Sequence, residues 1–399
     1  MSYREISTIE ISGTKKSISF TRLFYKFSFI LCLFPFAIRL LERDLQPLYF
    51  IVLGICLVLS YRTKTSSYLL LLLLTGLSII IYRLRFDYEF VDIIRSLPIY
   101  LTPIFLFRFF EACLSTSAFI FSAIRLSIYI YVMYASLQLF GIDILGMNNE
   151  ERVASGRGFT SLTNEPSMFG FILTLLMASM LFGREETRLD WTIYAVGMLL
   201  CGSASALICS IPLFATLLSL KFIAILVTSL SIVILGLIEL NIEAIVPPRL
   251  IYIIQSSGLD IFLSDHSINE RVGHLAFIFS NPIHFLIGGI HGWGSSYLEF
   301  LTLGNHPFFF GSGVNNILSG IGGVIFDGGM LGIFYILLMI KISNLRLRNM
   351  STRDVLICVG LFFVAIQSVS FANPLLTIPL ACNALAYNEF FKKAKSRNL

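Results

Sequence analysis

The sequence predicts an all-α polytopic membrane protein, and two observations carry this prediction. Of the 399 residues, 56% are hydrophobic and only 13% are charged, whereas soluble domains carry about 25% charged residues. Apolar runs also recur almost end to end, at lengths close to the roughly 20 residues that cross a bilayer as a helix. In lipid a helix satisfies its own backbone hydrogen bonds, so helices are the expected spanning elements.

The apolar runs predict about twelve spans in a single membrane domain that covers residues 1–399. The predicted spans are 22–41, 46–61, 66–82, 90–110, 116–140, 165–182, 190–201, 203–219, 221–241, 317–341, 353–371 and 373–390. The runs 46–61 and 190–201 are short, so ten or eleven crossings remain an alternative. One long polar segment, 242–316, interrupts the series.

The basic residues predict the orientation, because Lys and Arg concentrate on the cytoplasmic side of membrane proteins. With a cytoplasmic N-terminus and twelve crossings, most of the 29 Lys and Arg residues face the cytoplasm. We therefore expect both termini in the cytoplasm and the segment 242–316 on the outer face. The net charge of +5 suits anionic lipid headgroups, and no basic domain indicates nucleic-acid binding.

The first outward segment, 141–164, contains Arg152 and Arg157. Two glycines flank Arg157 and would let its backbone approach a ligand closely. Arginine binds phosphate through a planar fork, although either residue could instead be solvated or contact lipid headgroups. Pro166 predicts the start of the next helix and places Glu165 at its mouth. Glu165 is a candidate general base, or a group that stabilises the helix through its macrodipole.

The second outward segment, 242–316, contains all five histidines of the chain. Ser267 and Glu270 form a capping-box pattern, which predicts an amphipathic helix over about 268–280 at the membrane surface. Arg271 lies at the start of this helix, and a stretch that begins at Ile287 is expected to be flexible. The catalytic candidates here are His266, His274 and His306, and each of them alone is more often structural.

Several kinds of chemistry lack a signal in the sequence. No histidine pair has the spacing of ligands on one helix, and the seven cysteines fall in or beside predicted spans. No phosphate-binding glycine loop precedes a lysine. We therefore expect no metal and no cofactor, and a donor substrate that is linked to lipid. Arg125 and Asp327 fall within predicted spans, where a charge has either a function or a buried partner.

The chain resembles the Wzy-type O-antigen polymerases and, more distantly, the O-antigen ligases of bacterial envelopes. The matching motifs are Arg157-Gly158-Phe159 before Glu165-Pro166-Ser167, Arg271 on a helix with Gly288-Gly289 beyond it, and Asn315-Asn316-Ile317-Leu318 before Gly328-Gly329-Met330-Leu331-Gly332. The ligases usually have a His-Asn pair before the tenth span. This chain has Asn315-Asn316 there, and His306 lies upstream.

The resemblance implies a GT-C-like membrane glycosyltransferase at the periplasmic face of the bacterial inner membrane. Its implied substrate is an undecaprenyl-diphosphate-linked oligosaccharide, whose repeats it joins into O-antigen or a related surface polysaccharide without metal or nucleotide. Arg152, Arg157 and Arg271 would bind the diphosphate, and Glu165, or else His266, His274 or His306, would act as the base. The alternatives are an O-antigen ligase that transfers glycan to lipid A-core, and a lipid-linked oligosaccharide flippase or transporter. The sequence does not decide whether a chain-length regulator protein is a further partner.

Overall fold

The computed structural model is all-helical over the residues that it describes. These are 14–36, 47–59, 66–83, 90–112, 117–142, 158–163, 165–217, 266–280, 282–289, 293–304, 319–345, 350–367 and 369–397. Each regular element in these ranges is an α-helix, so the predicted all-α class is confirmed.

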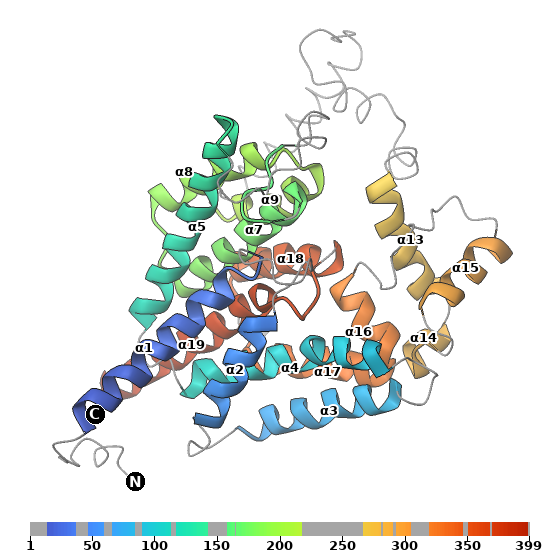
Figure 1. Cartoon of the computed structure of the whole chain (residues 1–399), viewed down its shortest axis with the longest axis horizontal. Coiled ribbons are helices and arrows are strands. Elements are labelled where there is room, and N and C mark those ends of the chain that lie inside the picture. Colours follow the sequence, from blue (N-terminus) through green and yellow to red (C-terminus); the bar gives the residue numbers. More distant parts are fainter. Residues whose placement is uncertain are drawn as a thin grey trace, which may run out of the picture.

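The helices follow the predicted apolar runs closely. They are α1 (Thr14–Leu33), α2 (Pro47–Leu59), α3 (Ser67–Arg83), α4 (Phe90–Ala112), α5 (Ser117–Leu139), α7 (Pro166–Gly183), α8 (Arg188–Cys201), α9 (Ala204–Ala215), α13 (His266–Ser280), α14 (Pro282–Ile287), α15 (Trp293–Gly304), α16 (Gly320–Gly328), α17 (Met330–Ile342), α18 (Thr352–Gln367) and α19 (Pro374–Arg397). The predicted span 221–241 lies outside the described residues. In Figure 1, α13, α14 and α15 lie to one side of the bundle that the other helices form.

In the part of the chain that the structure describes, two helical segments are long and apolar enough to cross a membrane, Ala118–Leu139 of α5 and Pro166–Gly183, which is α7. Shorter apolar segments of 10–17 residues also occur within the described ranges. They are Leu23–Leu33, Leu48–Leu59, Ser67–Arg83, Ser205–Ala215, Met330–Ile342 and Pro374–Tyr387. The structure thus has apolar helices at most of the predicted spans.

Helix α7 lies at the centre of the bundle. It packs against α5, α8, α9, α18 and α19, and nearly all of its residues are buried. A helix that is apolar on every side is stable only where neighbours or lipid surround it. The position of α7 therefore fixes both of its ends, including Glu165, against several other helices.

Basic side chains gather at one end of the bundle. Arg125 on α5 pairs with Asp190 near the start of α8 at 3.1 Å, and Arg353 near the start of α18 pairs with Glu186 at 2.6 Å. Gly183, the last residue of α7, lies against Phe121 of α5 at this end of the bundle. We call this the basic end and define it by Lys26, Arg125, Arg184, Arg188, Lys341 and Arg353. The opposite end contains the start of α7 and is called the Glu165 end.

The predicted span 317–341 forms two helices, α16 and α17, instead of one. Gly329 separates them with φ 52° and ψ −126°, a conformation open to glycine and strained for other residues. Helix α17 then packs back against α16, since a Cβ added to Gly332 would lie 2.1 Å from the Val324 carbonyl oxygen. The single predicted helix is therefore wrong, because the chain turns sharply at Gly329.

A buried ion pair holds this turn against α3 and α4. The Asp327 Oδ2 atom accepts hydrogen bonds from Arg83 Nη1 at 3.0 Å and from the Tyr100 hydroxyl at 2.6 Å. The two charged side chains are only 8% and 12% exposed. The hydroxyl of Tyr335 on α17 donates in turn to the Tyr100 carbonyl at 2.7 Å. Asp327 and Arg125, two of the charged residues within predicted spans, thus each have an ion-pair partner.

Asp327→Asn is expected to lower the free energy of unfolding by about 3–5 kcal/mol, because it removes the buried carboxylate that pairs with Arg83. The control is Glu111→Gln, which weakens the pair with Arg108. Because Glu111 is 37% exposed, this change should cost at most about 1 kcal/mol. Denaturant unfolding of the purified variants in one detergent measures both values, and equal losses would contradict the assigned role of the pair.

Candidate functional site

A buried polar loop, 158–163, leads to the start of α7. Thr160, Ser161 and Thr163 are all fully buried. The Ser161 backbone N–H donates to the Gln138 side-chain oxygen at 2.8 Å, and its hydroxyl donates to the Tyr131 carbonyl at 2.6 Å. Ser161 has φ 52°, which is uncommon for a residue other than glycine. The bonds from α5 stabilise this conformation and fix the loop at the Glu165 end.

Gly158 anchors the same loop to the end of α8. The Phe159 N–H donates to the Leu200 carbonyl at 3.0 Å, and Gly158 has φ 80°. A Cβ at Gly158 would lie 2.2 Å from the Cys201 carbonyl oxygen. The sequence predicts that glycines beside Arg157 allow a close approach to a ligand. For Gly158 the close approach is instead to α8 of the same chain.

Glu165 is the last residue before α7 and has an extended backbone, with φ −143° and ψ 145°. Its carbonyl accepts from the Phe169 N–H at 3.1 Å and from the Thr163 hydroxyl at 2.8 Å. Its side chain makes no capping hydrogen bond to the helix backbone. The Ser167 hydroxyl donates to its Oε2 atom at 3.3 Å. The backbone is therefore fixed, while the half-buried carboxylate does not cap the helix by hydrogen bonding.

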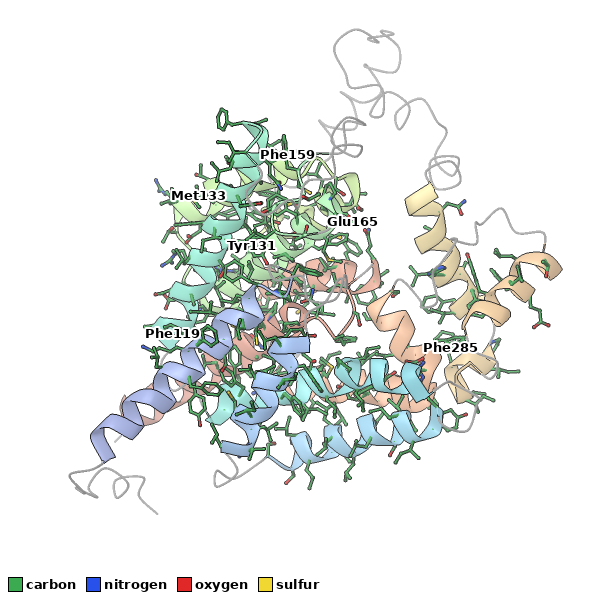
Figure 2. All side chains as sticks on the ribbon, viewed as in Figure 1. Phe119, Tyr131, Met133, Phe159, Glu165 and Phe285 are labelled. Carbon is green, nitrogen blue, oxygen red and sulfur yellow. The ribbon has the colours of Figure 1, made fainter. Side chains whose placement is uncertain are left out.

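Figure 2 shows Glu165 on the side of the bundle that faces α13 in this view. The carboxylate can accept hydrogen bonds from a hydroxyl and take up its proton, as a general base requires. The site thus combines a fixed backbone with one acidic side chain at the Glu165 end.

His274 lies inside the contact between α13 and α15. Its side chain is 1% exposed, and its ring meets the Tyr297 ring edge-on, with the centroids 4.9 Å apart. Asn269, one turn earlier, is also fully buried. The helix begins at His266, two residues before the predicted start, so Ser267 lies within the first turn and not ahead of it. His274 therefore has a packing role that the sequence left open.

The remaining candidates are placed only in part. His266 and Arg271 belong to α13, and the structure describes only the backbone of these two residues. Arg152, Arg157 and His306 lie outside the described residues. In the described ranges, no group of three or more His, Cys, Asp or Glu side chains could hold a metal ion.

Two glycine pairs of the resemblance motifs lie against each other, which the sequence alone did not indicate. The Gly289 N–H donates to the Phe326 carbonyl at 2.7 Å, and a Cβ at Gly288 would lie 2.6 Å from the same oxygen. A Cβ at Gly329 would lie 2.7 Å from the Gly288 nitrogen. The stretch predicted to be flexible is therefore held in place at these two glycines, beside the turn between α16 and α17.

Glu165 and His274 belong to different packing units. Helix α13 packs on α14, α15 and α16, whereas α7 packs within the main bundle. Phe277 and Tyr297 share a separate apolar cluster with Phe326 on α16. Since α16 also packs on α18, it is one of the elements that link the two candidate regions.

Gly158→Ala is expected to destabilise the fold more than Gly141→Ala. Both residues have positive φ, 80° and 76°, so each alanine should cost about 1–2 kcal/mol. An added Cβ has nothing within 4 Å at Gly141, whereas at Gly158 it overlaps the end of α8. That overlap should add roughly 1–3 kcal/mol. The measurement is the unfolding free energy in one detergent, and similar losses for the two variants would exclude the contact with α8.

Comparison of the chain with protein families, with curated proteins and with solved structures finds no match. Its function must therefore be argued from its own residues and from the motif resemblance. The described part of the candidate site is Glu165 with the loop that holds it, at the end of the bundle opposite the basic end.

Proposed function

We propose that this protein is a membrane glycosyltransferase that joins undecaprenyl-diphosphate-linked oligosaccharide repeats into O-antigen or a related surface polysaccharide. The reaction would take place at the periplasmic face of the bacterial inner membrane. One observation carries the proposal. A half-buried carboxylate that does not cap its helix, Glu165, is held by a buried polar loop at one end of an apolar bundle.

The outer faces of the helices support a location in the membrane. Large apolar side chains point outward along several helices, including Leu74 on α3, Leu199 on α8 and Phe362 on α18. Soluble proteins rarely expose apolar surface on this scale, and lipid would cover it. The basic end would then face the cytoplasm, and the Glu165 end would face the periplasm, with about twelve helices crossing.

The chemistry needs a base and a binding site for diphosphate. The terminal hydroxyl of one lipid-linked repeat attacks the anomeric carbon of the chain on a second carrier. The hydroxyl oxygen forms the new glycosidic bond, Glu165 takes the proton, and the bond to the diphosphate breaks, with its electron pair leaving on the lipid diphosphate. Arg152, Arg157 and Arg271 would stabilise that developing charge. The hydrogen-bonded loop before α7 favours catalysis because it holds the base in position in advance.

Two other functions share part of this evidence. An O-antigen ligase would use the same donor and transfer the glycan to lipid A-core. A flippase needs polar groups along a path through the bundle, whereas Glu165 and its polar loop lie together at one end. A deletion strain separates polymerisation from the other two functions. Single repeats on lipid A-core indicate lost polymerisation, and lipid A-core without glycan indicates lost ligation or transport.

Glu165→Gln should abolish polymerisation by the purified protein, because the amide cannot take a proton although its size is unchanged. Glu185→Gln is the control, since it makes the same exchange at an exposed position of the basic end. The assay measures polymer length from purified lipid-linked repeats with a chelator present. Near-normal polymer from Glu165→Gln would exclude this residue as the base and direct attention to His266, His274 and His306.

The orientation predicts the behaviour of reporter fusions. A phosphatase that is active only in the periplasm should work when it is fused after residue 260 and fail when it is fused after residue 395. The physical reason is the concentration of basic side chains at the opposite end from Glu165. The reverse pattern would place Glu165 in the cytoplasm, where the proposed reaction has no substrate.

A further inference from the structure

The unit formed by α13 and α14 exposes large apolar side chains, although it also buries Phe277 and Ile278 in an apolar cluster. The polar residues Asn269 and His274 are buried, whereas Phe279 and Leu286 are 61% and 63% exposed. Ile287, the last residue of α14, is 43% exposed. In water, folding normally buries large apolar side chains and leaves amides and imidazoles at the surface. The exposed side of this unit therefore suits an apolar environment.

The exposed apolar side chains continue directly onto the bundle. The Tyr82 hydroxyl on α3 donates to the Ile287 carbonyl at 2.7 Å, so the end of α14 lies beside the last turn of α3. Ile81, the neighbour of Tyr82, is 64% exposed. Met330 at the start of α17 is also exposed, and it follows Gly329, which contacts the Leu286 carbonyl. The end of α14 thus lies beside the end of α3 and the start of α17, and each of these three helices exposes large apolar side chains there.

Among the side chains that the structure describes at the junction between the bundle and α14, the charged ones are buried. Arg83 and Asp327, which lie at the same junction, are buried and paired with each other. The exposed side chains named at this junction, Ile81, Leu286, Ile287 and Met330, are apolar, and the ion pair lies buried beside them. Lipid acyl chains match such a surface, and the same lipid would cover α3 and α17 in the proposed membrane location.

We propose that α14 and the last turn of α13 insert into the outer leaflet of the bilayer, where Phe279, Leu286 and Ile287 contact phospholipid acyl chains. The segment 242–316 is then anchored in the membrane at its middle. Because this inference rests on the membrane location in the proposed function, it needs a test that separates the two. It also deepens that function, since it holds α13 at the level of the headgroups, where a lipid diphosphate lies.

The test uses single tryptophans in nanodiscs that contain phosphatidylcholine with brominated acyl chains, which quench tryptophan in lipid. The background is the full chain with its two native tryptophans replaced, Trp191→Phe and Trp293→Phe. Leu286→Trp and Phe279→Trp report on the proposed contact. Ile81→Trp is the control within the bundle, and Thr302→Trp on α15 is the aqueous control, since Thr302 is exposed. Acrylamide, which quenches from water, is measured in parallel on each variant.

Leu286→Trp and Phe279→Trp should lose as much fluorescence to brominated lipid as Ile81→Trp, and several-fold more than Thr302→Trp. Strong quenching of Ile81→Trp, with Leu286→Trp and Phe279→Trp quenched only by acrylamide, would overturn the insertion and leave the membrane location intact. Weak quenching of all four by brominated lipid would overturn the membrane location itself. Protection of both reporters from both quenchers would mean that protein covers the surface, which also contradicts the proposal. Two reporters keep the test decisive if one variant does not fold.

Discussion

The ion pair between Arg83 and Asp327, with the Tyr100 hydroxyl, is the interaction on which the arrangement of the two candidate regions depends. It fixes the turn between α16 and α17 against α3 and α4. Gly288 and Gly289 pack against that turn. Phe326, which lies just before the turn, packs on Phe277 of α13. A buried pair is costly to desolvate, so its value here lies in specifying one position for α13 relative to the bundle.

A different constraint acts at the start of α7. Glu165 is held through its backbone by Thr163 and by the helix, and the loop before it is held by Gln138, Tyr131 and the end of α8. These contacts involve the backbone, while the Glu165 carboxylate accepts a hydrogen bond from the Ser167 hydroxyl at 3.3 Å. A backbone held in one position beside a carboxylate is the arrangement that a preorganised base requires.

Local sequence patterns predicted the positions of the helices better than the contacts between residues that are distant in sequence. Pro166 correctly indicated the start of α7, and the apolar runs indicated most helices, because periodicity and proline are local signals. The turn at Gly329 was missed, since a glycine pair within an apolar run also fits a continuous helix. The partners of Arg125, Asp327 and Gly158 are distant in sequence and have no local signature. Arg152, Arg157 and His306 stay predictions, because they lie outside the described residues.

The turn at Gly329 has a consequence for the bilayer itself. Helix α16 begins beside Val369 at the end of α18 and ends beside Arg83, so both of its ends lie at the Glu165 end and only α17 crosses toward the basic end. With 13 residues, α17 is about 20 Å long, which is shorter than the roughly 30 Å hydrocarbon core. In a membrane this hydrophobic mismatch would be relieved by local thinning of the bilayer. Thinning beside α3 and α17 would bring the two headgroup layers closer together on this side of the bundle.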